Sequence, residues 1–240
     1  RVAPTVRWMP VRTLVLVLAS VGVKKSSPTV QLQFSTRVET TAHQLNATEG
    51  YPPYKRYFTV YFDFVARRSR IDYDLVPHMP PKSFVRRYDL GFEWMVTEVL
   101  GEKRCEKSKL REAMPMPRYP ERLLFLGQEK VRGTLCDRWR EDHGEETVDL
   151  FLTVEANVPV RLSTASVDMA SPEQTLTPVM TYDFFDFERR PPPEDAFRMK
   201  ASSSSPIFEN QEPLTVDKCE RVVQDMGFPY IHFMHMYYYT

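Results

Sequence analysis

Large apolar residues alternate with polar ones along much of the chain, which is the pattern of β-strands that have one buried face. In residues 57–64 the alternating large apolar positions are Phe58, Val60, Phe62 and Phe64. A charged stretch follows at 67–70, and the alternation resumes at 71–75. Two alternating runs joined by a short polar stretch predict a β-hairpin.

Further runs of the same kind predict strands at 90–96, 123–129, 133–140, 148–154, 158–162 and 179–188. Phe92 and Trp94 lie on the apolar side of the first run, and Leu150 and Leu152 on that of the fourth. The last run is the most aromatic, with Tyr182 and Phe184 on the same side. The sequence therefore predicts a mainly β fold with an antiparallel sheet.

The two ends of the chain depart from this pattern. Residues 24–56 are polar, and only 29–34 are expected to form a strand. At the other end, 216–226 combine a capping box with apolar residues on one helical face, which predicts a short C-terminal helix. A Ser-rich linker precedes that helix, so residues 24–200 are expected to form the β domain, and 201–240 a linker and a helix or strand packing on it.

The N-terminus has the features of a secretory signal peptide. A charged start at 9–12 leads into an apolar run at 14–23, which is too short to cross a bilayer as a helix. Residues 1–23 are therefore interpreted as a signal-peptide-like segment. Asn46 opens an Asn-Ala-Thr sequon in a polar stretch, so a secretory route would allow glycosylation there.

Charge and composition argue against several function classes. Lys plus Arg and Asp plus Glu both number 32, so no net field attracts nucleic acid. The sequence has no glycine-rich phosphate loop and no GxSxG nucleophile motif, and its cysteines lack a papain-like context. We expect no catalytic residues and no metal site. Calcium remains a minor alternative at the acidic clusters 142–146 and 183–188, which lack the Asp-x-Asp-x-Asp-Gly pattern.

Three cysteines, Cys105, Cys136 and Cys219, allow one disulfide and one free thiol. Their spacing matches no zinc or redox motif. An extracellular or lumenal location, either secreted or lysosomal, would favour a disulfide. Residue spacing alone does not decide which pair forms it.

The order of several strand signals resembles the ependymin-related and LolA-like superfamily. The resemblance rests on Gly-Thr-Leu-Cys-Asp-Arg-Trp at 133–139, on the segments 148–152, 158–162, 182–187 and 193–197, and on the hairpin at 57–73. It implies a strongly curved antiparallel half-barrel around a hydrophobic pocket, in proteins that are secreted or lysosomal and often dimeric, some of them binding calcium. It also implies a bridge between Cys136 and Cys219. Because Cys219 lies far beyond Phe197, Cys105 remains a rival partner.

The large apolar residues on the alternating faces are the candidate pocket: Phe58, Val60, Phe62, Phe64, Phe92, Trp94, Leu150, Leu152, Tyr182 and Phe184. Alternation alone does not separate an open pocket from a filled core. The expected function is a secreted, non-catalytic domain that binds a lipid or acyl chain. The alternative is an accessory domain without a ligand of its own, because similar LolA-like domains precede papain-like cysteine proteases in some protists and lower eukaryotes. The corresponding partners are a hydrophobic small molecule, a second copy of the chain or a downstream protease domain.

Overall fold

The structure is a computed structural model that describes residues 26–43, 55–74, 80–99, 102–120, 122–167, 175–198 and 219–221. Its strands are β1 (Gln33–Ala42), β2 (Lys55–Asp63), β3 (Arg68–Tyr73), β4 (Lys82–Arg87), β5 (Phe92–Val99), β6 (Glu102–Lys109), β7 (Leu124–Val131), β8 (Thr134–Asp142), β9 (Glu146–Thr153), β10 (Pro159–Val167), β11 (Leu176–Glu188) and β12 (Glu220–Arg221). The described residues include one short 3₁₀ helix, η1 (Glu194–Phe197).

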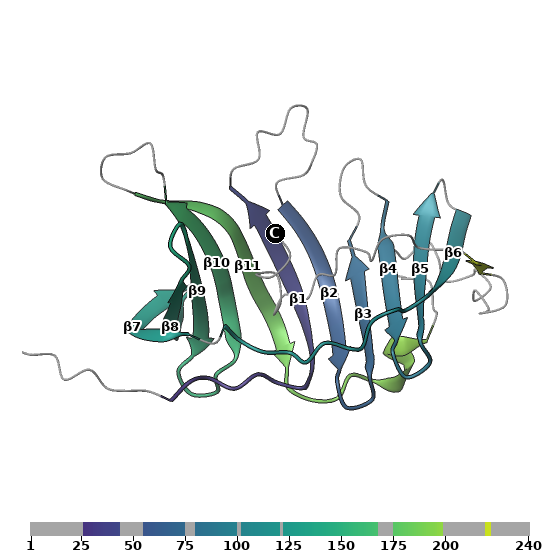
Figure 1. The fold of residues 1–240 in the computed structure, drawn as a ribbon, viewed down its shortest axis with the longest axis horizontal. Helices are drawn as coiled ribbons and strands as arrows, with labels where there is room; N and C mark the ends of the chain where they lie inside the picture. Colours follow the sequence, from purple (N-terminus) through teal and green to yellow (C-terminus); the bar gives the residue numbers. More distant parts are fainter. Residues whose placement is uncertain are drawn as a thin grey trace, which may run out of the picture.

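All twelve strands belong to one open sheet in the order β12-β6-β5-β4-β3-β2-β1-β11-β10-β9-β8-β7 (Figure 1). Two antiparallel meanders, β1–β6 and β7–β11, meet where β1 pairs with β11. Among the described strand pairs, β12–β6 alone is parallel. The predicted antiparallel, mainly β fold is therefore confirmed.

Bulges bend this sheet. The register shifts between β1 and β11, between β10 and both of its neighbours, and between β7 and β8. Each bulge adds local bend and twist to its strand. Figure 1 accordingly shows β10 and β11 strongly bent, and β7 and β8 turned away from the plane of β2–β5.

One long connection spans the sheet. It leaves β6 near one edge and enters β7 at the other edge, and Figure 1 shows it passing across the front of the strands. We call residues 110–120 with 122–123 the crossover. Prolines at 115, 117 and 120 remove backbone donors, which explains why this stretch does not join the sheet.

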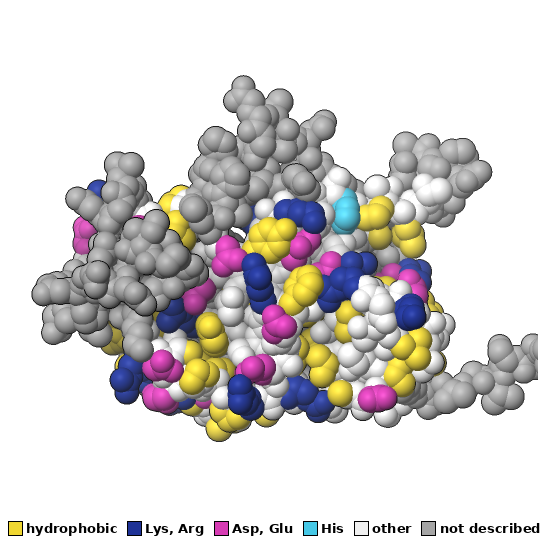
Figure 2. Space-filling view, turned by 180° about the vertical axis from the view of Figure 1, so that it is seen from behind, with side chains coloured by type: hydrophobic (Ala, Val, Ile, Leu, Met, Phe, Trp, Pro, Cys, Tyr) yellow, Lys and Arg dark blue, Asp and Glu magenta, His cyan; other side chains and the backbone are white. Residues whose placement is uncertain are grey.

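The sheet has two chemically different faces. The face we call inner carries the main core, whose fully or mostly buried members are Phe34, Val38, Phe58, Val60, Phe62, Tyr119, Trp139, Val148, Leu150, Leu152, Leu162, Tyr182 and Phe184. On the outer face, charged and apolar side chains are interspersed over the centre of the sheet (Figure 2). Arg161, for example, donates two hydrogen bonds of 2.8 Å to Asp183 there.

The predicted C-terminal helix is wrong where the structure describes it. Glu220 and Arg221 are extended and pair with Glu106 and Lys107 of β6. The cause is covalent, since Cys219 is bonded to Cys105 and this bond places the next two residues along the edge of β6. The rest of the predicted helix, the Ser-rich linker, the signal-peptide-like segment and the sequon at Asn46 lie outside the described residues.

Candidate functional site

Eight of the ten predicted pocket residues belong to the inner face. Seven are buried in its core: Phe58, Val60, Phe62, Leu150, Leu152, Tyr182 and Phe184. Phe64 is partly buried and packs against them. Strands far apart in the sequence supply them, and pairing of Val38 with both Phe58 and Phe184 puts β2 and β11 on either side of β1.

The other two predicted residues lie on the opposite face. Residues paired across neighbouring strands share a face. Phe62 pairs with Ser69, Ser69 with Arg86, and Arg86 with Glu93, so Glu93 lies on the inner face with Phe62. The neighbours of Glu93 in β5 therefore point to the outer face, and these are Phe92 and Trp94. They pack with Val85, Val96 and the disulfide, so the prediction that all ten residues line one pocket is wrong for these two.

Aromatic rings fill much of the inner face. The ring centroid of Phe34 lies 5.3 Å from that of Phe62 and 5.0 Å from that of Phe187. At the far end of the sheet, the Phe125 and Trp139 rings are 5.3 Å apart. These are contact distances for aromatic pairs, so the inner face is a packed apolar layer.

Phe34 belongs to a strand that the sequence pattern largely missed. In β1 the inner positions alternate between Phe34, Thr36, Val38 and Thr40, all of them buried. Two of the four are threonines, so the stretch looks polar. Because threonine favours strands, the alternating Phe, Thr, Val, Thr pattern is the signal that could have located β1.

The crossover covers part of the inner face. Its residues Met114, Tyr119 and Leu123 pack against the core. Near its start, the backbone N–H of Leu110 donates to the carbonyl of Gly91 at 3.0 Å. Near its end, the backbone N–H of Arg122 donates to Glu141 at 3.1 Å. An irregular segment, rather than a second sheet, therefore supplies this cover.

Buried tyrosines add polar groups to the inner layer that are uncharged at neutral pH. Burial raises the pKa of Tyr73 and of Tyr182 to about 12, and it also raises the pKa of Tyr119. Nearby, the indole N–H of Trp139 is buried and has no hydrogen-bond acceptor among the described residues. Around these residues the layer combines an apolar surface with un-ionised polar groups, and the buried Arg86–Glu93 ion pair lies farther along the same face.

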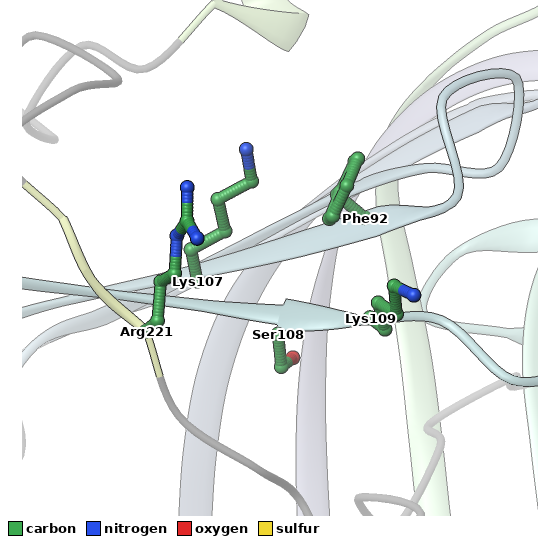
Figure 3. A pocket seen from close by; sticks show the side chains of 5 residues that line it. All are labelled: Phe92, Lys107, Ser108, Lys109 and Arg221. Carbon is green, nitrogen blue, oxygen red and sulfur yellow. The ribbon is translucent and has the colours of Figure 1, made fainter.

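A second site lies on the outer face where β5, β6 and β12 meet. A pocket of about 330 Å³ is lined there by Phe92, Lys107, Ser108, Lys109 and Arg221. Figure 3 shows Lys107 and Arg221 projecting to the same side of β6, while Ser108 points the other way. The Lys107 ammonium lies 4.1 Å from the centre of the Phe92 ring, a cation–π contact.

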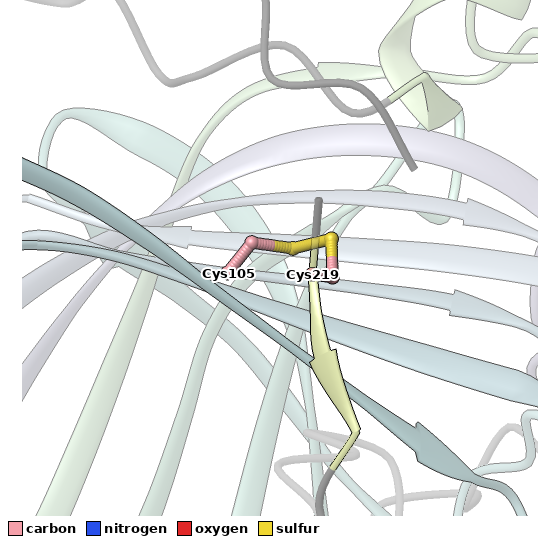
Figure 4. The surroundings of a disulfide bond; sticks show 2 residues. All are labelled: Cys105 and Cys219. Atoms are coloured by element: carbon pink, nitrogen blue, oxygen red, sulfur yellow. A yellow bond between two sulfur atoms is a disulfide. The ribbon is translucent and has the colours of Figure 1, made fainter. Parts of the chain in front are cut away.

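The disulfide next to this pocket joins Cys105 to Cys219, with their Cα atoms 4.6 Å apart (Figure 4). The predicted Cys136–Cys219 bridge is therefore wrong. Cys136 is a free, fully buried thiol in β8, where it packs with Val131, Phe151 and Val160. Because β8 and β12 lie near opposite edges of the sheet, Cys136 is out of reach of Cys219.

Within the described part of the chain, no three His, Cys, Asp or Glu residues are grouped as a metal site would require. Among the acids considered for calcium, Asp183 is bound by Arg161, and Glu188 by Arg190. Because these carboxylates form ion pairs with arginines on the outer face, they are poorly suited to bind calcium.

Comparison with known proteins does not assign a family. No family model and no curated protein matches the chain. Among solved structures, an uncharacterized conserved protein from Thermus thermophilus matches with 10% identity and a TM-score of 0.47, over 81% of this chain and 92% of that one. Two crystal forms of PNGF-II match with 6% and 5% identity and TM-scores of 0.29 and 0.32. The chain spans only 30% and 31% of their length.

Proposed function

We propose that this chain is a non-catalytic domain that holds a hydrophobic ligand, such as a fatty acyl chain, between the inner face of its sheet and the crossover. One observation carries the proposal: the large apolar face of a single curved sheet is covered, among the described residues, by an irregular segment. A sheet normally buries such a face against a second sheet or helices. The resemblance to LolA-like proteins supports the same function.

The crossover is the part of the cover that a ligand could replace. Its apolar contacts come from Met114, Tyr119 and Leu123, and it forms no ladder with the strands beneath it. An acyl chain that occupied the same surface would restore the lost apolar contacts. Displacing the crossover would break few backbone hydrogen bonds, since its described ones lie at its two ends.

The expected affinity is moderate. Burying about twelve methylenes gains roughly 10 kcal/mol at ~0.8 kcal/mol each. Association and ordering of the chain cost about 4–15 kcal/mol, and displacing the crossover adds to this cost. Dissociation constants in the micromolar range are therefore expected.

We also propose that the domain works in an oxidising compartment, either secreted or in a lysosomal or other endomembrane lumen. The Cys105–Cys219 disulfide supports this location, because disulfides persist mainly outside the reducing cytosol. The signal-like start and the sequon agree with it. In the described part of the chain, no helix has the length and apolarity needed to cross a bilayer.

The test is a titration of purified, delipidated protein with a fluorescent fatty acid and with a neutral fatty alcohol. We expect both to bind saturably at micromolar concentration, with little dependence on salt for the alcohol. Met114→Gln should tighten binding severalfold, because losing the packing of Met114 on the inner core lowers the cost of displacing the crossover. Met116→Gln is the matched control, since Met116 is two residues away in the same segment and 59% exposed.

Absence of saturable binding up to high micromolar, with no lipid retained in native mass spectrometry, would contradict the proposal. It would favour the accessory-domain alternative. That alternative has its own support in Leu124 and Leu126 of edge strand β7 and Leu135 of β8, which are 64%, 50% and 51% exposed. Exposed leucines along a sheet edge are typical of protein contact.

A further inference from the structure

The edge of the sheet at β6 and β12 brings like charges together. In the parallel pairing, Arg221 lies directly opposite Lys107, and Glu220 lies opposite Glu106. Like charges facing each other across a strand pair destabilise the pairing. Among the described residues, β12 pairs with β6 through two residues, and the Cys105–Cys219 bond keeps these repelling side chains adjacent.

The positive pair forms one wall of the outer-face pocket. Lys107, Lys109 and Arg221 contribute three positive charges around the Phe92 ring (Figure 3). No carboxylate of the described residues forms an ion pair with any of the three. Elsewhere on the outer face the pattern differs, since Arg161 pairs with Asp183, and Arg138 and Arg140 pair with Asp149.

The Phe92 ring gives the pocket an aromatic surface, with Trp94 beside it. Lys107 lies above the rings of Phe92 and Trp94, with its ammonium 4.1 Å and 5.5 Å from their centres. The indole N–H of Trp94 is buried and has no acceptor in the described part of the chain. The site therefore combines positive charge with an apolar ring surface, and an anion placed there would relieve the repulsion between Arg221 and Lys107.

We propose that this pocket binds an organic anion whose phosphate, sulfate or carboxylate group pairs with Lys107, Lys109 and Arg221, and whose flat apolar part packs on Phe92. A volume of about 330 Å³ suits a small molecule of this kind. The site lies on the opposite face of the sheet from the proposed acyl site and is formed by different residues.

The disulfide is a structural requirement of this site. Arg221 is two residues from Cys219, and it reaches the pocket because the bond to Cys105 places β12 beside β6. Without the bond, the repulsion between facing charges favours separation of β12. The pocket would then lose Arg221 but keep Lys107 and Lys109, which belong to β6.

Phenyl phosphate is a suitable probe, because it combines a dianion with an aromatic ring. Isothermal titration at low salt should show one saturable site that binds phenyl phosphate more tightly than inorganic phosphate. Lys107→Gln and Arg221→Gln should each weaken phenyl phosphate by about tenfold, the effect of losing one charged hydrogen bond. Lys130→Gln is the matched control, since Lys130 is exposed on β7 at the other edge of the sheet. Added salt should weaken the binding of phenyl phosphate to the wild type more than its binding to either of these two variants.

A second arm tests the role of the disulfide. In the Cys105→Ser, Cys219→Ser double variant, phenyl phosphate should bind about as weakly as in Arg221→Gln, and adding Arg221→Gln to it should cause no further loss. Equal affinity in wild type, Lys107→Gln and Arg221→Gln would overturn the proposal, as would absence of saturable binding to the wild type. Binding of the neutral fatty alcohol, unchanged by these lysine and arginine variants, reports separately on the acyl site.

Discussion

Replacing Cys105 and Cys219 together by alanine tests how the bridge stabilises the fold. The bridge spans 114 residues, a segment that includes the crossover and β7–β11. If β12 stays in place in the variant, the chain-entropy model gives a loss of about 5 kcal/mol, because the unfolded chain regains a loop of that length.

A smaller loss follows if β12 separates from β6. The folded variant then also gains freedom, and a loop of 21 positions, the separation of the described residues Arg198 and Cys219, sets the scale of that gain. The difference between closing the two loop lengths is only about 1.5 kcal/mol. Because the described residues of β12 pair with β6 only through two facing like-charge pairs, we expect β12 to separate and the loss to be close to about 1.5 kcal/mol.

Urea unfolding of the oxidised wild type and the double alanine variant measures this difference. Trp94, which packs beside the bridge, and Trp139 in the inner core provide fluorescence probes. A loss near 5 kcal/mol would refute the separation of β12. No loss at all would refute the bridge as a stabilising link, and peptide mapping that finds Cys136 bonded to either cysteine would refute the pairing itself.

Three further outcomes follow from buried polar groups. Burial raises the pKa of the Cys136 thiol, so maleimide should label it only after unfolding; rapid labelling of the native protein would contradict its burial. Burial alone would raise the pKa of Asp149, but hydrogen bonds from Arg140 and Arg138 outweigh it and lower the pKa below the unfolded value of 3.8. Asp149→Asn should therefore cost about 1–3 kcal/mol at pH 7, and in urea unfolding this cost should shrink as the pH falls below 3.8; an equal cost at pH 7 and pH 3 would contradict the ion pairs. Glu93→Gln removes the carboxylate that binds Arg86 in a buried site and should cost about 3–5 kcal/mol in the same assay, whereas loss of the exposed Glu112 should cost under about 1 kcal/mol; similar costs for both would contradict the burial of the pair.

Local alternation identified most strands but not their neighbours. Residues 57–64 and 148–154 predict β2 and β9 because large apolar residues recur at every second position along them. The sequence does not show that β1 and β11 lie between them, since that pairing joins residues about 150 positions apart and leaves no local pattern. The sequence therefore indicates which residues belong to the inner-face site, but not how the sheet brings them together.

Face assignment failed for a related reason. Phe92 and Trp94 alternate with polar residues just as Phe58 and Phe62 do. Alternation within one strand does not show, however, whether its apolar side lies on the same face of the sheet as that of another strand. That choice depends on the register of β3 and of β4 (Lys82–Arg87), and β4 has no run of alternating large apolar residues. The outer pocket was missed as well, because Lys107 and Arg221 are more than a hundred positions apart and the disulfide brings them together.

The two proposed sites share one structural element, the start of the crossover. Lys109 lines the outer pocket, and the next residue, Leu110, holds the crossover through its bond to Gly91, which precedes Phe92 of the same pocket. An anion bound to Lys109 would fix this end of the crossover and raise the cost of displacing it from the inner face. Phenyl phosphate should therefore weaken binding of the neutral fatty alcohol, by about fivefold at the low end of typical coupling energies.

Linkage requires the reverse effect to be equal: saturating fatty alcohol should weaken phenyl phosphate by the same factor. Titrating each ligand with and without the other measures both factors. Lys109→Gln should abolish the coupling and leave binding of the alcohol alone unchanged, since Lys109 is exposed and contributes nothing to the inner core. A loss of alcohol affinity that keeps growing as phenyl phosphate is raised, without reaching a plateau, would mean that the two ligands compete for a common site. A factor of one in both directions would mean that the acyl chain enters without moving the start of the crossover, and would place its point of entry toward Tyr119 and Leu123.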